Sequence, residues 1–528
     1  MKKLPIGIST FGEIIQDNAY YVDKSRYLRQ LFDSGKYFFL SRPRRFGKSL
    51  FVDTLKCAFE GRQELFKGLY LENHWDWQDA YPVISISFGG GRFSDIDHLN
   101  NSFEEILIAN AHQAGVELTG ITINGRFKNL ITSISKKYGK NVIILVDEYD
   151  KPILDHIEDP ARAETMRDGL KNFYSVIKDS DRYIRFCFIT GVSKFSKVSI
   201  FSDLNNLEDI SLLPEMGTLC GYTELELITT FKERLDGVEI DTLRQWYNGY
   251  FFLGKDRVYN PFDVLLFLKK RAYGNYWFES ATPTFLVKLL QQNRFYLPQL
   301  EGLEVNESVI SSFSIDQLTA ETVLFQSGYL SIESVRQVGP RRVFRLNFPN
   351  QEVKLSFTDA LLVGYTPPIP SLAGFQNTMY MALESRDMEN IRAGFKSLFS
   401  SIPYEWYTAG SLDQYEGYYA SVVYSFLASL GFDLRPEQSS SHGRADLILK
   451  TDRYVYVIEF KVVEIVGDGQ KAIDQIREKG YHDQYVQAGE DVTLVGMDFS
   501  KKERNLVGFA FEFASETNLH LSGDAPVQ

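Results

Sequence analysis

An apolar run rich in aromatic residues, 37–41, leads into a basic loop that closes on Gly47-Lys48-Ser49, and residues 50–60 are expected to form a helix. Backbone N–H groups at a helix start face bound phosphates, and the helix dipole favours their charge. Lys48 could reach the β and γ phosphates, and the Ser49 hydroxyl could ligate Mg²⁺. This order of strand, loop and helix predicts that the chain binds ATP or GTP.

The loop departs from the usual phosphate-binding pattern at one position, because Arg42 stands where the first glycine is expected. A bare Gly-Lys-Ser would arise by chance in such a chain about one time in four, so it needs support from elsewhere. The run 142–146 gives that support, since it is typical of a strand buried on both faces of a parallel sheet. Asp147 and Glu148 follow it, at the strand end where ligands bind in open α/β sheets. Asp147 would hold Mg²⁺ through water and Glu148 would polarise the attacking water; the alternative is a solvated acidic turn.

Two more strands are expected at 81–88 and 184–189, and helices at 99–114 and 165–178 separate the strands. Thr190 follows the last of these strands and is a candidate sensor of the γ phosphate, with a strand-end cap as the alternative. Strands that alternate with helices predict an α/β fold with a doubly wound parallel sheet.

A second group of charged residues lies near the C-terminus. Asp446 precedes a short apolar strand, and the strand 454–461 is expected to be its hairpin partner. Glu459 and Lys461 are two residues apart, so both point to the same face. Two carboxylates with backbone oxygens suit Mg²⁺ or Mn²⁺, and a lysine beside them could orient a water in metal-assisted phosphodiester cleavage. A cross-strand salt bridge is the alternative.

The first group of motifs resembles the AAA-ATPase-like family common in gut and other anaerobic bacteria. The resemblance rests on residues 21–25, 42–49, 145–152 and 190–195 and covers about residues 5–270. In that family Arg-Pro-Arg-Arg-Phe-Gly-Lys-Ser is the usual form of the loop, and ATP is the expected nucleotide. The residues that the resemblance and the loop chemistry assign to nucleotide and Mg²⁺ are Arg45, Gly47, Lys48, Ser49, Leu50, Asp147 and Thr190.

The second group resembles the PD-(D/E)xK nuclease superfamily, over about residues 380–515, and in particular the nuclease-like domain often fused to this ATPase. Asp446, Glu459 and Lys461 match its catalytic signature. Glu416, in an expected helix, matches an acidic metal-binding residue of the first core helix. Gln475 and Tyr481 resemble a helix motif found in some branches, with looser spacing.

A chain of 528 residues with 44% hydrophobic content should form two or three packed domains. We expect a P-loop parallel-sheet ATPase domain at 1–221, a mostly helical middle or lid region with one hairpin at 222–375, and a restriction-endonuclease-like α/β domain at 376–528. The proline-rich run 365–370 sets the main boundary. No apolar run is long enough to span a membrane, and the three scattered cysteines are typical of a cytoplasmic protein.

The sequence therefore predicts a cytoplasmic ATPase coupled to a Mg²⁺-dependent nuclease-like domain that acts on nucleic acid, DNA in the first place. The net charge of −12 argues against nucleic-acid binding, although arginines 341, 342 and 345 form a local basic patch. The alternative is a nucleotide-dependent switch whose nuclease-like domain only binds nucleic acid or a partner protein. A phosphotransferase is less favoured, because Glu148 beside Asp147 suits hydrolysis. A homo-oligomer, with Arg44 or Arg45 acting on a neighbour's nucleotide, stays open.

Overall fold

The computed structural model describes residues 1–194, 197–201, 204–278, 284–311, 318–366, 372–402, 416–436, 439–440, 443–444 and 446–514. By compactness the chain divides into an N-terminal unit (Met1–Ala281 with Glu304–Glu352) and a C-terminal unit (Thr282–Leu303 with Val353–Gln528). The three ranges expected from the sequence stay a prediction about domains. Most of the proline-rich run that was expected to separate two of them, 367–370, lies outside the described residues.

The N-terminal unit is built on a five-stranded sheet of order β2-β3-β4-β1-β5 in which every neighbouring pair is parallel. Its strands are β1 (Tyr37–Ser41), β2 (Val83–Ser87), β3 (Val142–Asp147), β4 (Ile184–Gly191) and β5 (Glu208–Asp209). The runs of β1 and β3 are buried along their whole length, as expected for strands covered on both faces. The predicted parallel α/β sheet is confirmed.

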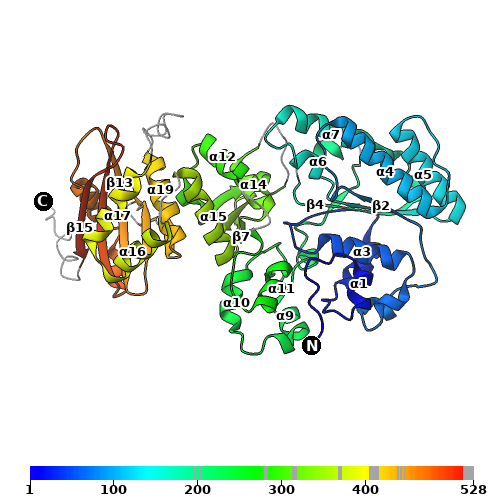
Figure 1. The fold of residues 1–528 in the computed structure, drawn as a ribbon, viewed down its shortest axis with the longest axis horizontal. Coiled ribbons are helices and arrows are strands. Elements are labelled where there is room, and N and C mark those ends of the chain that lie inside the picture. The colour runs from blue at the N-terminus through cyan, green and yellow to red at the C-terminus, as the bar shows by residue number, and fades with distance from the viewer. Residues whose placement is uncertain are drawn as a thin grey trace. The chain divides into compact units, whose positions relative to one another are not determined.

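Helices cover both faces of this sheet (Figure 1). One face carries α4 (Ile96–Ala114), α5 (Ile123–Tyr138), α6 (Lys151–Leu154) and α7 (Pro160–Asp179), and the other carries α1 (Phe11–Gln16) and α3 (Lys48–Phe59). The carboxyl ends of β1 and β3 and the start of α3 therefore lie at one edge of the sheet, where a nucleotide site was expected.

The rest of this unit is mostly helical, with one long hairpin, as the sequence predicted. Its helices are α2 (Ser25–Ser34), α8 (Lys197–Ile200), α9 (Glu224–Thr230), α10 (Ile240–Tyr247), α11 (Pro261–Lys270), α13 (Glu307–Ser311) and α14 (Ala320–Ser327). The hairpin pairs β7 (Ser331–Val338) with β8 (Arg341–Asn347), and β6 (Leu303–Asn306) lies beside β8. An apolar cluster that includes Tyr20, Leu227, Leu243 and Val264 packs α9, α10 and α11 against the N-terminal segment.

The C-terminal unit holds a mixed sheet of order β15-β14-β13-β12-β9, in which only β13 and β14 are parallel. Its strands are β9 (Asp433–Pro436), β12 (Leu447–Lys450), β13 (Tyr454–Val463), β14 (Asp491–Ser500) and β15 (Leu506–Ala514), and a separate small ladder joins β10 (Ser439–Ser440) to β11 (Gly443–Arg444). The predicted hairpin of β12 and β13 is confirmed. Its register pairs Leu447 with Ile458.

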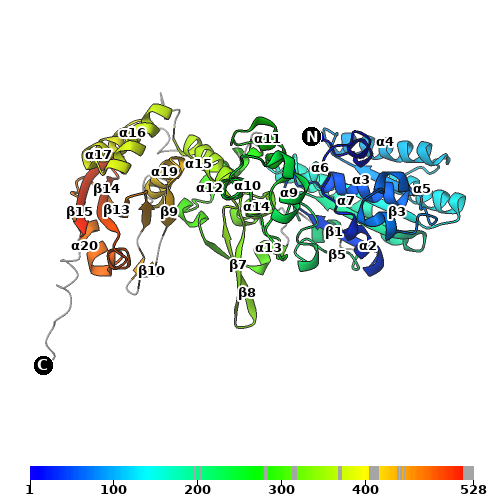
Figure 2. The same ribbon diagram turned by 90° about the horizontal axis from the view of Figure 1, so that it is seen from below.

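Helices pack on both faces of this second sheet, and they are α16 (Leu372–Ser385), α17 (Met388–Ser400), α19 (Glu416–Ser429), α20 (Gln470–Lys479) and α21 (Asp483–Gln487). The unit also contains α12 (Thr284–Gln292) and α15 (Gln351–Tyr365). Figure 2 shows α16 and α17 on one side of the strands and α20 on the other. Among the described residues, no helix combines the length and the apolar character that crossing a bilayer requires.

Candidate nucleotide and metal sites

The phosphate-binding loop joins β1 to α3, as predicted. Gly47 caps the start of α3 with φ of 90°, a left-handed conformation that glycine adopts without strain. A Cβ at Gly47 would meet no atom within 4 Å, so backbone conformation rather than space favours glycine. The loop thus directs the free N–H groups of the first turn of α3 toward the cavity described below.

Lys48, the first residue of α3, is buried at the base of the loop. Its ammonium donates hydrogen bonds to the carbonyl oxygens of Arg42 and Pro43, each at 3.0 Å. Burial lowers the pKa of Lys48, and the negative charge of Asp147 opposes that shift. The Lys48 ammonium and the Asp147 carboxylate therefore interact electrostatically.

Asp147 is the last residue of β3 and Glu148 follows it, where the sequence placed them. Asp147 is buried, and its Oδ1 has no hydrogen-bond partner among the described residues. Glu148 has φ of 55°, a conformation that costs a non-glycine residue about 1 kcal/mol or more. Burial, followed by the charge of Asp147, raises the pKa of Glu148. Strain and a raised pKa at a strand end are typical of functional positions.

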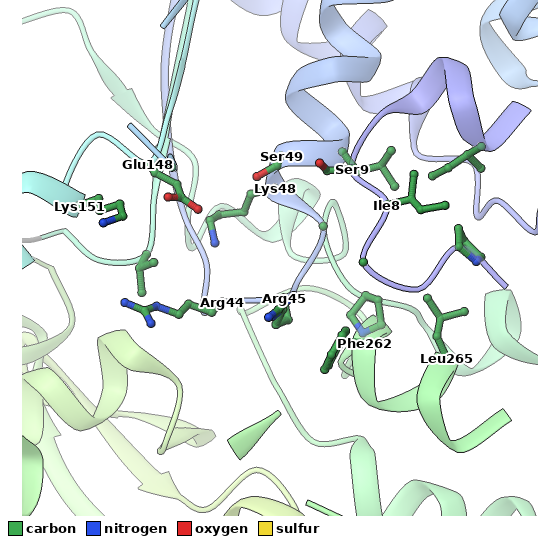
Figure 3. Close-up of a pocket in the computed structure, with 18 of the residues that line it drawn as sticks. Ile8, Ser9, Arg44, Arg45, Lys48, Ser49, Glu148, Lys151, Phe262 and Leu265 are labelled. Carbon is green, nitrogen blue, oxygen red and sulfur yellow. The ribbon is translucent and has the colours of Figure 1, made fainter. Parts of the chain in front are cut away.

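A cavity of about 540 Å³ opens beside these residues. Lys48, Ser49 and Glu148 line its polar end, where Figure 3 shows Lys48 and Glu148 extending toward each other. Ile8, Phe262 and Leu265 line an apolar end between the N-terminal segment and α11 (Figure 3). The remaining predicted residues on its wall are Arg45, Gly47 and Leu50. One cavity thus joins donors suited to phosphates with a wall suited to a base.

Thr190 and Arg42 do not line this cavity. The Thr190 hydroxyl is fully buried and donates to the Leu40 carbonyl at 2.9 Å, so it is part of the sheet and not of the cavity wall. The guanidinium of Arg42 also points away, donating to the carbonyls of Ser41, Ser211 and Met216. Arg42 therefore supports the structure beneath the loop and does not line the cavity.

Sequence reasoning missed Asp150, which also lines the cavity. Its buried carboxylate accepts hydrogen bonds from the N–H groups of Val192 and Ser193 and from the Ser193 hydroxyl. It therefore ties the end of β3 to the end of β4. The acidic run that begins at Asp147 was the available signal, but only the sheet order shows which strand Asp150 binds.

Ser49 and Asp147 fit a hard cation. Mg²⁺ prefers hydroxyl, carboxylate and water oxygens, and the unsatisfied Asp147 Oδ1 is such a ligand. The half-buried Ser49 hydroxyl lies on the cavity wall close to Lys48 (Figure 3). These two side chains are therefore the protein's own candidates for holding the metal of a bound nucleotide.

In the C-terminal unit, Asp446, Glu459 and Lys461 come together at the paired ends of β12 and β13. The N–H of Asp446 donates to Glu459 Oε2 at 3.4 Å, and the N–H of Phe460 donates to Asp446 Oδ2 at 2.8 Å. Lys461 Nζ donates to Glu459 Oε1 at 3.2 Å. The hairpin thus places the three predicted side chains in one site.

Helix α20 adds a fourth group. The Gln475 side-chain amide donates to Glu459 Oε1, the oxygen that Lys461 also contacts. Tyr481 instead belongs to the buried apolar cluster beneath α20. Glu416 is the first residue of α19, but its side chain lies outside the described part of the chain.

Glu459 is almost completely buried, with 1% of its surface exposed. Burial, and then the negative charge of Asp446, raise the pKa of Glu459 to about 7, while Lys461 opposes the shift. A divalent ion would offset this cost of ionisation, and two carboxylates suit Mg²⁺ or Mn²⁺. Within the described residues no three His, Cys, Asp or Glu side chains gather into a metal cluster, so the site would draw on water or backbone oxygens as well.

Asp498 on β14 is the residue of this region that sequence reasoning missed. It pairs with Lys461 across the parallel strands and is 3% exposed. Its Oδ2 accepts the N–H of Gly469, which caps the start of α20, while its Oδ1 has no partner among the described residues. No local pattern marks Asp498, because its place depends on the pairing of β13 with β14.

The comparisons with known proteins agree with the two predicted domain families. A family model described as "Predicted AAA-ATPase" matches residues 5–201, and one for the PD-(D/E)XK nuclease superfamily matches residues 414–509. The "Uncharacterized protein in vnfD 5'region" of Azotobacter chroococcum mcd 1 is 46% identical over 512 residues, which cover 97% of this chain and 99% of the relative. The chain therefore belongs to the family of AAA-ATPase-like proteins that carry a C-terminal PD-(D/E)XK nuclease superfamily domain.

Proposed function

We propose that this protein binds and hydrolyses ATP at the cavity beside Lys48 and uses a Mg²⁺-dependent site at Glu459 to cleave DNA. The observation that carries the proposal is the convergence of Asp446, Lys461 and Gln475 on the buried Glu459 carboxylate, in a chain that also holds a phosphate-binding loop. The family supports a nucleotide-dependent, nuclease-like protein. The DNA substrate and the two activities, ATP hydrolysis and DNA cleavage, are our proposal.

At the nucleotide cavity, Lys48 would leave the carbonyls of Arg42 and Pro43 to contact phosphates. Glu148 would orient the attacking water, and its raised pKa suits a group that accepts a proton. The base would lie against Ile8, Phe262 and Leu265. Ser49 and Asp147 would hold Mg²⁺, which neutralises charge on the phosphates.

At the second site, Asp446 and Glu459 would hold the metal, which supplies Lewis acidity toward the phosphodiester. Lys461 would orient the attacking water and stabilise negative charge. Gln475 would keep the Glu459 carboxylate in a single orientation through its amide contact. A cytoplasmic enzyme of this design would reach DNA directly.

A cleavage assay on single- and double-stranded DNA and on RNA, with Mg²⁺ or Mn²⁺ and with or without ATP, tests the proposal. Asp446→Ala should abolish cleavage while ATP hydrolysis persists, and Lys48→Ala should abolish hydrolysis. Asp468→Asn is a matched control, since Asp468 is an exposed acid whose carboxylate accepts the N–H of Gln470. Metal-independent cleavage that survives Asp446→Ala would contradict the nuclease.

The second candidate is a nucleotide-dependent switch whose nuclease-like domain is inactive and only binds nucleic acid or a partner protein. The net charge of −12 favours it, because DNA-binding proteins usually carry a basic surface. ATP hydrolysis without cleavage of any substrate, under either metal, would place the switch first.

A further inference from the structure

The hairpin of β7 and β8 extends away from the helices around it (Figure 2). Residues 333–338 of β7 are all exposed, as are Arg341 and Arg342 at the start of β8. Val335 and Val338 are among the exposed large apolar side chains. The outer half of this two-stranded hairpin, called the ribbon below (residues 331–347), contributes little to the core. Packing alone therefore does not explain its length.

The charge of the ribbon is opposite to that of the whole chain. Residues 336–345 contain four arginines and no acidic residue, whereas the chain has a net charge of −12. Arg336 pairs with Glu304 at 2.7 Å, Arg345 pairs with Glu333 at 2.6 Å, and Arg342 pairs with Glu307. Arg341, next to the turn, has no ion-pair partner among the described residues.

The pairing register places three of these arginines on one face. Arg336 lies opposite Val343, Arg341 opposite Val338, and Arg345 opposite Ser334. Side chains of directly opposed residues share a face, and residues two apart on a strand do so too. Arg336, Arg341 and Arg345 therefore project from the same side of the ribbon, together with two valines.

We propose that this ribbon, residues 331–347, binds duplex DNA, with Arg336, Arg341 and Arg345 contacting its phosphates. The inference rests on the proposed function, in which DNA is the substrate, and adds the surface of the N-terminal unit that holds it. Exposed ion pairs contribute little to stability, so the arginines can exchange Glu304 and Glu333 for phosphates at small cost. The planar guanidinium suits phosphate at least as well as carboxylate.

The shape of the ribbon favours DNA over duplex RNA. The major groove of B-DNA is about 12 Å wide and admits a two-stranded β-ribbon, whereas that of A-form RNA is too deep and narrow. Arg341 and Arg345 are four residues apart on one strand, which corresponds to about 13 Å. The two guanidinium groups can therefore reach phosphates on both sides of the groove.

A groove of about 330 Å³ with several polar side chains on its wall lies at the foot of the ribbon and extends the surface. It is lined by Arg244, Arg257, Asn248 and Asn347, among others. Arg257 fixes the inner end of β7 by donating to the carbonyls of Ile332 and Glu333. Hydrogen bonds thus hold the base of the ribbon, while its outer residues are exposed.

The test is binding of a short fluorescent DNA duplex to the full chain in EDTA, so that no cleavage occurs, over a range of salt concentrations. Changing Arg336, Arg341 and Arg345 together to glutamine should weaken binding at least about tenfold near 0.1 M salt and reduce the slope of log K against log salt by about 3. The triple change to lysine should keep the slope. ATP hydrolysis and circular dichroism check the fold.

A charge-matched control changes Arg29, Arg162 and Arg182, which lie on α2, on α7 and just before β4, to glutamine. It should bind like the unchanged protein. Equal losses in both triple variants, unchanged binding by the ribbon variant, absence of DNA binding, or an effect confined to RNA would each overturn the inference. Cleavage in the presence of metal is measured separately. If the ribbon variant binds and cleaves DNA normally, only the inference about the ribbon is wrong. If DNA binds through the ribbon but is never cleaved, only the proposed nuclease activity is wrong.

Discussion

At the scale of single residues, Glu459 has a carboxyl group whose pKa is changed strongly by its surroundings. Its pKa is raised from 4.5 to about 7 by burial and by Asp446. A raised pKa means that the folded protein holds this proton more tightly than the unfolded chain. The metal-free protein should therefore lose stability as the pH rises toward and through about 7.

The same shift predicts the pH dependence of metal binding. A divalent ion must displace the Glu459 proton below pH 7, so the affinity for Mn²⁺ should rise about tenfold per pH unit up to about 7 and level off above it. Isothermal titration calorimetry at several pH values measures this. Glu459→Gln should bind weakly at every pH, and a flat profile in the unchanged protein would rule out Glu459 as the ligand.

Arg42 is a second residue whose role depends on its burial. Its guanidinium donates to three carbonyls and lies 3.9 Å from the centre of the Phe252 ring. Arg42→Ala would leave those carbonyls without their donor and should lower the free energy of unfolding by about 3 kcal/mol in a urea titration. Arg42→Lys keeps the charge without the forked donors, so its free energy of unfolding should lie between those of the unchanged protein and Arg42→Ala. Normal stability with lost ATP binding would instead mean that Arg42 contacts the nucleotide.

At the scale of elements, the start of α20 is fixed by very close backbone packing. Cβ atoms added at Gly467 and Gly508 would come within 2.2 Å of Asp498 Oδ2 and 2.6 Å of the Gly467 backbone, so the turn before α20 lies directly on β14 and β15. Asp498 holds that turn through Gly469. The helix in turn brings Gln475 to Glu459.

Asp498 should therefore influence cleavage through Gln475. Asp498→Ala is expected to reduce kcat about as much as Gln475→Ala, and the double variant should be no worse than either, because both remove the same contact. Asp498→Asn keeps an acceptor for Gly469 and should restore most of the activity. Additive losses, measured in the cleavage assay with thermal unfolding as a check on the fold, would show that Asp498 acts independently of Gln475.

The elements themselves were largely predictable, because their signals are local. The apolar runs of β1 and β3, the loop 42–49 and the β12–β13 hairpin all lie where hydrophobic pattern and turn residues placed them. The side-chain contacts that local pattern did not predict depend on neighbouring strands. Thr190 bonds to Leu40 only because β4 lies beside β1, and Asp498 faces Lys461 only because β14 lies beside β13.

At the scale of the whole molecule, the chain passes from one compact unit to the other within α15, between Glu352 and Val353. Glu352 is fully buried, and its Oε1 accepts the N–H of Trp277 at 2.7 Å. Burial, followed by the negative charge of Glu352, raises the pKa of Asp263 of α11 well above its usual range, so the two carboxyl groups interact. Residues of α11 also line the nucleotide cavity.

This arrangement joins the cavity to the helix that leads into the nuclease-like unit. If ATP shifts α11, the Asp263–Glu352 contact carries that shift to the first turn of α15. Asp263→Asn keeps the size of the side chain but removes its carboxyl group, so it should reduce the effect of ATP on DNA cleavage at least about fivefold, a coupling change of about 1 kcal/mol. ATP hydrolysis itself should stay within about twofold, because Asp263 does not line the cavity. Asp241→Asn, at an exposed aspartate on α10, is the matched control. Full ATP dependence of cleavage in a well-folded Asp263→Asn protein would show that the two sites communicate by another route or not at all.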